Sequence, residues 1–170
     1  MPRQIDFRSV SPHPADEVYA TMVDPDYLRA RLDRIGGPGA SLLEHTADLE
    51  GARYRLRLGL DAKDLPSAVR SVLPGDITVE RDERWTREDS GRYHGDVDVA
   101  IPGAPASANG GMRLRDLSDG GSELEVRLEV RVTVPLFGSK IEAVVGDQVQ
   151  RLLAAETAFT QDWLSGNGRP

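Results

Sequence analysis

A strict alternation of apolar and polar residues in the middle of the chain constrains its fold more than any other feature. From Glu123 to Val134 every even-numbered residue is leucine or valine, and the odd-numbered residues up to Arg131 are all charged. Arg53 to Leu60 repeats the pattern, with Tyr54 and three leucines opposite three arginines. Successive side chains along a strand point to opposite faces, so each segment predicts a strand with one buried and one solvated face.

Seven strands are predicted along the chain. Short turns rich in glycine, aspartate and serine separate several of them, which favours antiparallel neighbours. The predicted strands are Ile5 to Val10, Leu42 to Leu49, Arg53 to Leu60, Ile77 to Thr86, Arg92 to Ile101, Gly111 to Leu117 and Glu123 to Val134. Because each strand has one apolar face, the sheet needs another element to cover that face.

Three short helices are expected between the strands. The first opens at Pro14 with acidic residues in its first turn, and the second spans Asp24 to Arg34. Residues 64–73 place apolar side chains at helical spacing and predict a small amphipathic helix between the third and fourth strands. Strand parity puts this helix at the same end of the sheet as residues 102–110 and 135–139. It is either a lid over an opening or a packed connector.

The last helix is the only element long enough to cover the apolar face. It runs from Ser139 to Leu164, about 39 Å at 1.5 Å per residue. Ser139 and Glu142 have the spacing of a capping box, and Gly166 follows the end of the helix. We therefore expect an α+β fold in which a curved seven-stranded antiparallel sheet wraps around this helix.

Side-chain size decides whether the sheet and the helix leave a space between them. Aromatic residues make up 5% of the chain, and the inward residues are mostly valine and leucine. Gly95 falls on the same face as Tyr93 and Val97. Small residues on a concave wall leave room for a ligand, whereas valine and leucine can also pack into a solid core. Composition leaves both outcomes open.

Several segments carry a resemblance to a known superfamily. They are residues 134–142 (VPLFGSKIE), Leu65-Pro66, Glu83-Arg84-Trp85, Gly91 with Gly95, Pro102-Gly103-Ala104-Pro105, and Glu156 to Trp163 (ETAFTQDW). With the order of elements, they resemble the START-like, polyketide-cyclase-like (SRPBCC) helix-grip superfamily, and most closely a domain-of-unknown-function family within it. The resemblance covers nearly the whole chain. It implies a hydrophobic cavity in a superfamily whose members bind or transport lipids, sterols and polyketides, and some of which cyclise or dehydrate them. It carries over no catalytic residue.

Two charged residues fall on the apolar face of the fourth strand. Alternation puts Arg81 and Glu83 on the same face as Ile77, Val79 and Trp85. Burial of an unpaired charge is expensive. Either a bulge turns the two residues outward, or they pair, meet a ligand or lie at a wet cavity mouth.

Other polar residues on inward faces are candidates for ligand contact. His45 is either a hydrogen-bonded core histidine or a ligand donor and general base. Tyr54 and Tyr93 each either pack with one hydrogen bond or orient the polar end of a ligand. On the last helix, Gln148 interrupts the apolar stripe and Glu156 follows further along, so both can face the cavity. A helix edge that faces water explains Glu156 equally well.

These features favour binding or transport of a small hydrophobic or amphipathic ligand, similar to a lipid, sterol or polyketide. The candidate ligand-binding residues are His45, Tyr54, Leu56, Arg81, Glu83, Tyr93, Val97, Met112, Val145, Gln148, Val149 and Leu152. One alternative is a cyclase- or dehydratase-type enzyme that uses His45, Glu83 and Arg81. Another is a protein-interaction module with a filled core and an exposed apolar patch.

Composition argues against several other functions. The 28 acidic and 21 basic residues give a net charge of −7, which opposes a nucleic-acid surface. Cysteine is absent and the three histidines form no visible cluster, so we expect no metal and no cofactor. No apolar run reaches membrane-spanning length and no signal peptide is visible, which predicts a cytoplasmic location. We expect one domain over residues 1–166 and a flexible tail over 167–170, with the oligomeric state open.

Overall fold

The computed structural model describes residues 2–71 and 75–166. The predicted tail lies outside this range. In chain order the elements are β1 (Arg3–Ser11), α1 (Ala15–Met22), α2 (Pro25–Ile35), β2 (Ser41–Ala47), β3 (Gly51–Leu60), the 3-10 helix η1 (Ala62–Asp64), α3 (Ser67–Arg70), β4 (Ile77–Asp89), β5 (Arg92–Ala100), β6 (Ala106–Asp116), β7 (Ser122–Val132) and α4 (Gly138–Leu164).

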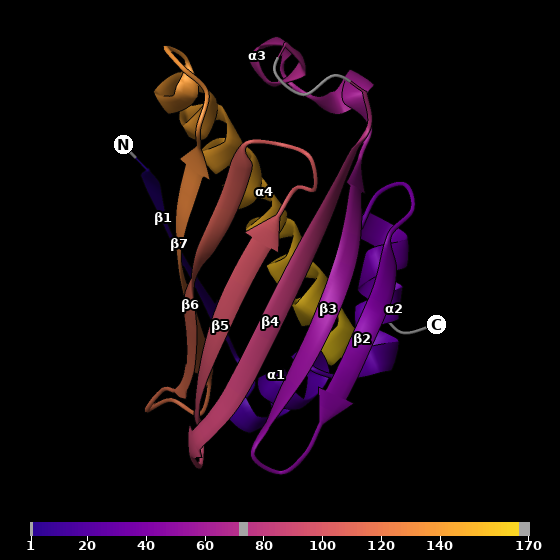
Figure 1. The fold of residues 1–170 in the computed structure, drawn as a ribbon. Coiled ribbons are helices and arrows are strands. Elements are labelled where there is room, and N and C mark those ends of the chain that lie inside the picture. Colours follow the sequence, from indigo (N-terminus) through magenta and orange to yellow (C-terminus); the bar gives the residue numbers. More distant parts are fainter. Residues whose placement is uncertain (1, 72–74, 167–170) are drawn as a thin grey trace.

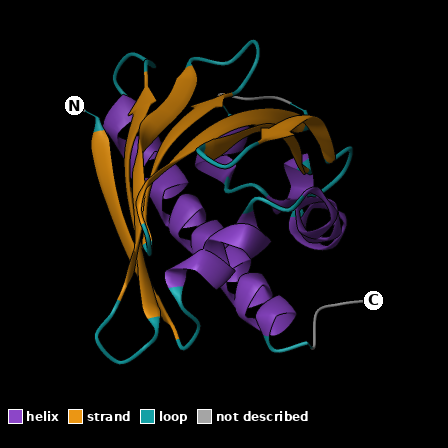
Figure 2. Cartoon of the chain, turned by 90° about the horizontal axis from the view of Figure 1, so that it is seen from below, coloured by secondary structure: helices purple, strands orange, loops and turns teal. Residues whose placement is uncertain are grey.

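The seven strands form one antiparallel sheet that curves around the last helix. The strand order is β1-β7-β6-β5-β4-β3-β2, so only β1 pairs out of sequence, with β7. Figure 1 shows α4 crossing the sheet diagonally, and Figure 2 shows the sheet bent around it. This is the predicted helix-grip fold. Within the described residues, no helix combines the length and apolar character needed to cross a membrane.

The short helices lie at opposite ends of α4. α1 and α2 contact its C-terminal half and the sheet, and α3 lies at the other end of the sheet, where it also contacts α4 (Figure 1). The single helix expected over residues 64–73 is instead η1 followed by the short α3. Pro66 explains the break because a residue before proline is driven out of the helical region, and Leu65 is extended. Residues 72–74 lie outside the described range.

β6 begins earlier than the alternation and turn signals predict. Asn109, Gly110 and Gly111 resemble a turn in sequence, yet all three lie inside the strand. A side chain at Gly110 would place its Cβ only 1.9 Å from the backbone oxygen of Arg127 on β7. The glycine therefore permits close approach of two strands, which only the tertiary pairing reveals.

β2 ends before the predicted Leu49. The pairing with β3 shifts register between Leu42 and Glu44, and the strand stops at Ala47. Asp48 then accepts hydrogen bonds from two backbone amides of the turn, which leaves Leu49 91% exposed. Local turn geometry therefore outweighs the apolar character of this residue.

The predicted capping box at the start of α4 is wrong. The helix begins at Gly138, after the cap residue Phe137, and no side chain caps it. Glu142 is buried and its Oε2 accepts a hydrogen bond from the backbone amide of Val132, at 2.9 Å. The carboxylate therefore ties the helix to the end of β7 instead of closing its own first turn.

Candidate functional site

The sheet and α4 do not meet completely, and they enclose a cavity of about 420 Å³. About half of its lining residues are leucine, valine or isoleucine, and nearly all of these lie on β3 to β7 or on α4. An engineered apolar cavity of about 150 Å³ holds benzene, and ligand pockets commonly measure about 300–1,000 Å³. The cavity is therefore large enough for a small organic molecule.

Most of the predicted ligand-binding residues line this cavity. They are Tyr54, Arg81, Glu83, Val97, Met112, Val145, Gln148, Val149 and Leu152. Those on strands share the concave face because alternate residues point the same way, and those on α4 share one stripe at spacings of three and four. The strand alternation thus predicted the sheet side of the cavity, and the helical spacing predicted the α4 side.

The exposed lining residues mark where the cavity opens. They are Leu60 at the end of β3, Pro105 and Ser107 around the start of β6, and Gln148 and Arg151 on α4. Leu65, Pro66 and Val69, from the segment around α3, also line the cavity at this end. The inserted segment thus covers part of the opening, and its movement as a lid stays a prediction.

His45 lies outside the cavity lining. Its Nε2 atom is 2.6 Å from the carbonyl oxygen of Val23, just after α1, and its ring stacks on Tyr54. Alternation correctly predicts that His45 faces inward. The chain between α1 and α2 covers this part of the sheet, however, so the imidazole is a half-buried group that is hydrogen-bonded to that chain segment. Of the three residues required by the cyclase-type alternative, the cavity lining therefore contains Glu83 and Arg81 but not His45.

Leu56 and Tyr93 also lie outside the lining. Leu56 is fully buried in the core. The Tyr93 hydroxyl donates to Asp16 in the first turn of α1, and the ring stacks on Tyr19 with centroids 4.0 Å apart. Burial, together with the Asp16 carboxylate, raises the pKa of Tyr93. This phenol packs against α1 with one hydrogen bond and does not reach the cavity.

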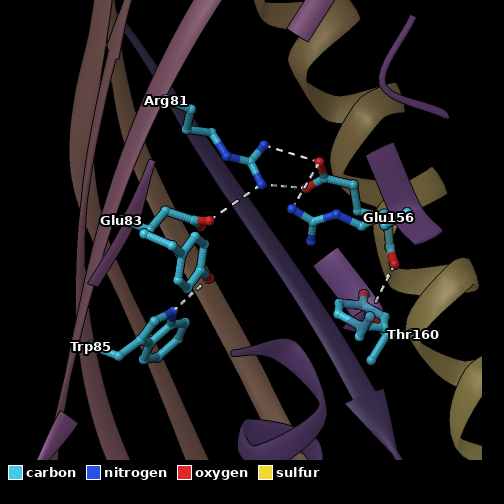
Figure 3. Close-up of polar contacts among 8 residues, drawn as sticks. Arg81, Glu83, Trp85, Glu156 and Thr160 are labelled. Carbon is cyan, nitrogen blue, oxygen red and sulfur yellow. Dashed lines mark hydrogen bonds and ion pairs between the residues drawn. The ribbon is translucent and has the colours of Figure 1, made fainter. Parts of the chain in front are cut away.

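Arg81 and Glu156 form a buried ion pair across the cavity, between β4 and α4 (Figure 3). Two guanidinium nitrogens of Arg81 donate to the two carboxylate oxygens of Glu156, each at 3.0 Å. Arg81 is 7% exposed and Glu156 is 7% exposed. β4 pairs regularly with both neighbours as far as Thr86, so no bulge turns Arg81 outward. Arg81 therefore points inward and is paired, as one of the two alternatives from the sequence predicted.

A second arginine, from α2, approaches the same carboxylate. Nη2 of Arg31 lies 3.8 Å from Oε2 of Glu156, and Arg31 is 6% exposed. Burial alone would raise the pKa of Glu156, but Arg31 and Arg81 outweigh it and hold that pKa below its usual value. Burial opposes the charge on Arg81, yet Glu156 and Glu83 together raise the pKa of Arg81. The pair is therefore ionised.

Glu83 and two aromatic residues extend this polar group along the sheet (Figure 3). Glu83 is 5% exposed and lies 3.5 Å from Arg81. The indole nitrogen of Trp85 donates to the hydroxyl of Tyr54 at 3.2 Å. Burial, followed by the nearby Glu83 carboxylate, raises the pKa of Tyr54 well above its usual value. One region of an otherwise apolar cavity is thus strongly polar.

Sequence reasoning missed Arg31. A signal was present, because Arg31 follows Tyr27 by four residues and Leu28 by three, and both are fully buried. An arginine at such a position is ordinarily assigned to the solvated edge of a helix. Its burial depends on Glu156, which lies 125 positions away in the chain.

The other two histidines have surface partners. His13 lies 3.3 Å from Glu17, and His94 lies 3.4 Å from Asp96 on the solvated face of β5. Within residues 2–71 and 75–166, no three histidine, aspartate or glutamate side chains are grouped so as to hold a metal ion.

The space beside Gly95 is filled by neighbouring side chains. A Cβ at Gly95 would lie 3.0 Å from Met112 Cε and 3.0 Å from Trp85 Cδ2. This glycine therefore admits the indole and the thioether, not a ligand.

Gly95→Ala should lower the free energy of unfolding by about 1–3 kcal/mol, because the added methyl overpacks this contact. Urea denaturation measures the change. Gly111→Ala is the matched control, since a Cβ at Gly111 meets no atom closer than 3.5 Å. An equal loss in the two variants would contradict this explanation.

Comparison with known proteins finds similarity over nearly the whole chain. A family model described as "Protein of unknown function (DUF2505)" matches residues 6–164. A Mycobacterium tuberculosis protein named "Uncharacterized protein Rv0481c" is 27% identical over 180 residues, covering 98% of this chain and 99% of that protein.

Solved structures show the same fold. The Zhui aromatase/cyclase from Streptomyces sp. R1128 matches with a TM-score of 0.60 and 15% identity, covering 99% of this chain and 97% of that one. A START superfamily protein from Mycobacterium smegmatis matches with a TM-score of 0.56 and 12% identity, covering 94% and 98%. At these identities the match establishes shared architecture alone.

Proposed function

Because this chain belongs to the DUF2505 family, whose description names no ligand, we propose a function from the cavity itself: the protein binds or carries a small hydrophobic or amphipathic molecule. The observation that carries this proposal is the apolar space of about 420 Å³ between the sheet and α4. Protein interiors are ordinarily close-packed, so a void of this size costs stability unless something fills it.

Burial of the ligand supplies the affinity. A molecule that hides about 200 Å² of apolar surface gains about 5 kcal/mol at 25 cal/mol per Å². Part of this gain is lost to the ordering of ligand and protein on association. The charged cluster that surrounds the Arg81–Glu156 pair then orients the ligand.

The two alternatives have less support. A protein-interaction module requires a filled interior, and the cavity opposes it. A cyclase-type site that uses His45 lacks this residue in the cavity, because the imidazole is bonded to Val23. Ligand binding without a catalysed reaction is therefore the function that requires no further residue in the cavity.

Native mass spectrometry of protein purified from its own host tests the proposal. We expect a fraction of the protein to carry a bound small molecule that denaturation releases and that organic extraction recovers. Protein that is empty in every preparation, and whose melting temperature does not change across a panel of lipids and aromatic compounds, would overturn it.

A further inference from the structure

Three charged side chains that line the cavity have hydrogen-bonding capacity left over: Arg31, Glu83 and Arg81, whose Nε atom is buried without a hydrogen-bond partner among the described residues. Nη2 of Arg31 is buried and has no hydrogen-bond partner among the described residues. Its nearest anionic contact is the 3.8 Å approach to Glu156, which already receives both of its short bonds from Arg81. A buried donor that is unpaired in this way is expensive, and a ligand atom that accepts from the guanidinium relieves the cost.

Glu83 is the corresponding acceptor. Within the described part of the chain, its carboxylate has one hydrogen bond, a contact of 3.5 Å with Nη2 of Arg81, at the outer limit for such a bond. Both Glu83 and Arg31 line the cavity. A ligand group that both accepts and donates a hydrogen bond therefore finds an unused partner for each role.

The charges in this part of the cavity already balance. Two guanidinium groups, from Arg31 and Arg81, lie with two carboxyl groups, from Glu83 and Glu156. A charged ligand would add one more buried charge without a partner, and burial of such a charge is costly. The cluster therefore favours an uncharged polar group.

Along β4, these charged groups lie far from the end of the sheet at which α3 lies. Ile77 begins β4 beside α3, and Glu83 is six residues further along the strand, a distance of about 20 Å at 3.3 Å per residue. The lining between the opening and the charged cluster is apolar at Ile77 and Val79. A ligand that enters from the α3 end and reaches the cluster must therefore be apolar along most of its length and polar at its inner end.

We propose that the ligand is an uncharged amphipathic molecule with an alcohol or phenol at its inner end. Its oxygen accepts a hydrogen bond from the Arg31 guanidinium, and its hydroxyl proton is donated to Glu83. This proposal rests on the ligand-binding function above and specifies the chemistry of the ligand.

Isothermal titration with naphthalene, 2-naphthol and 2-naphthoate at neutral pH tests it, because the three probes share one ring system. We expect 2-naphthol to bind roughly 10-fold or more tightly than either other probe, as one to two net hydrogen bonds allow. Equal binding of all three, or tightest binding of the carboxylate, overturns the head-group proposal and leaves the cavity function intact. If none of the three probes binds, the result counts against both the head-group proposal and the ligand-binding function of the cavity.

Glu83→Gln provides a second test because it gives the charged cluster one excess positive charge. We expect the affinity ratio of 2-naphthoate to 2-naphthol to rise roughly 10-fold in this variant. Asp82→Asn is the matched control, since it removes one negative charge from the opposite face of β4 and should leave the ratio unchanged. An unchanged ratio in folded Glu83→Gln contradicts the proposal. If that variant does not fold, the wild-type series decides.

Discussion

Replacement of Glu156 by glutamine should lower the free energy of unfolding by about 3–5 kcal/mol, because removal of one partner leaves buried charge unpaired. Arg81 and Arg31 both face this carboxylate, and both are almost fully buried. A neutral amide accepts a hydrogen bond but offsets neither guanidinium charge. Urea denaturation monitored by circular dichroism measures the change.

An exposed ion pair supplies the control for this prediction. Glu129 lies 2.9 Å from Arg131 on the solvated face of β7; the Arg131 side chain is exposed and that of Glu129 is partly exposed. Glu129→Gln should cost less than about 1 kcal/mol, because water screens such pairs. If Glu156→Gln is no more costly than Glu129→Gln, the buried ion pair is not the stabilising contact described here.

Ala108→Trp should abolish measurable binding of an apolar probe without unfolding the protein. Ala108 lines the cavity on β6 and pairs with Val99 and Val130 on the flanking strands. An indole at this position occupies the space that the ligand needs. We expect the affinity for naphthalene to fall by roughly 100-fold, about 2.7 kcal/mol. The free energy of unfolding should hold or rise by about 0.5–2 kcal/mol, as cavity-filling substitutions commonly give.

The adjacent residue offers a matched control for the same change in size. Asn109 is exposed on the opposite face of β6, so Asn109→Trp adds an indole outside the cavity. Its affinity for naphthalene should equal that of the wild type. Undiminished binding by folded Ala108→Trp would show that the probe binds elsewhere.

The fold was predictable because its periodicities are long and uninterrupted. The alternation through Glu123 to Val134 specifies both the strand and its buried face, since a shift of one residue would expose every apolar side chain. The same argument placed Arg81 and Glu83 on the inner face. It could not choose between burial and a bulge, because that choice depends on Glu156 on a distant helix.

Alternation predicts the face of the sheet to which a side chain points, but it does not predict which element packs against that side chain. His45, Tyr93 and Tyr54 all point inward, yet only Tyr54 lines the cavity. α1 and the chain after it cover the sheet around the other two. That packing brings together segments far apart in sequence, and no local pattern encodes it. The burial of Arg31 escaped prediction for the same reason.

The central claim is that the space between the sheet and α4 holds an apolar molecule. A crystal structure of the protein with 2-bromonaphthalene tests it most directly, because anomalous scattering locates the bromine. We expect a bromine peak inside the cavity, between Val97 and Met112 on the sheet and Val149 on α4. Side chains that close this space, with bromine bound only on the outer surface, would contradict it.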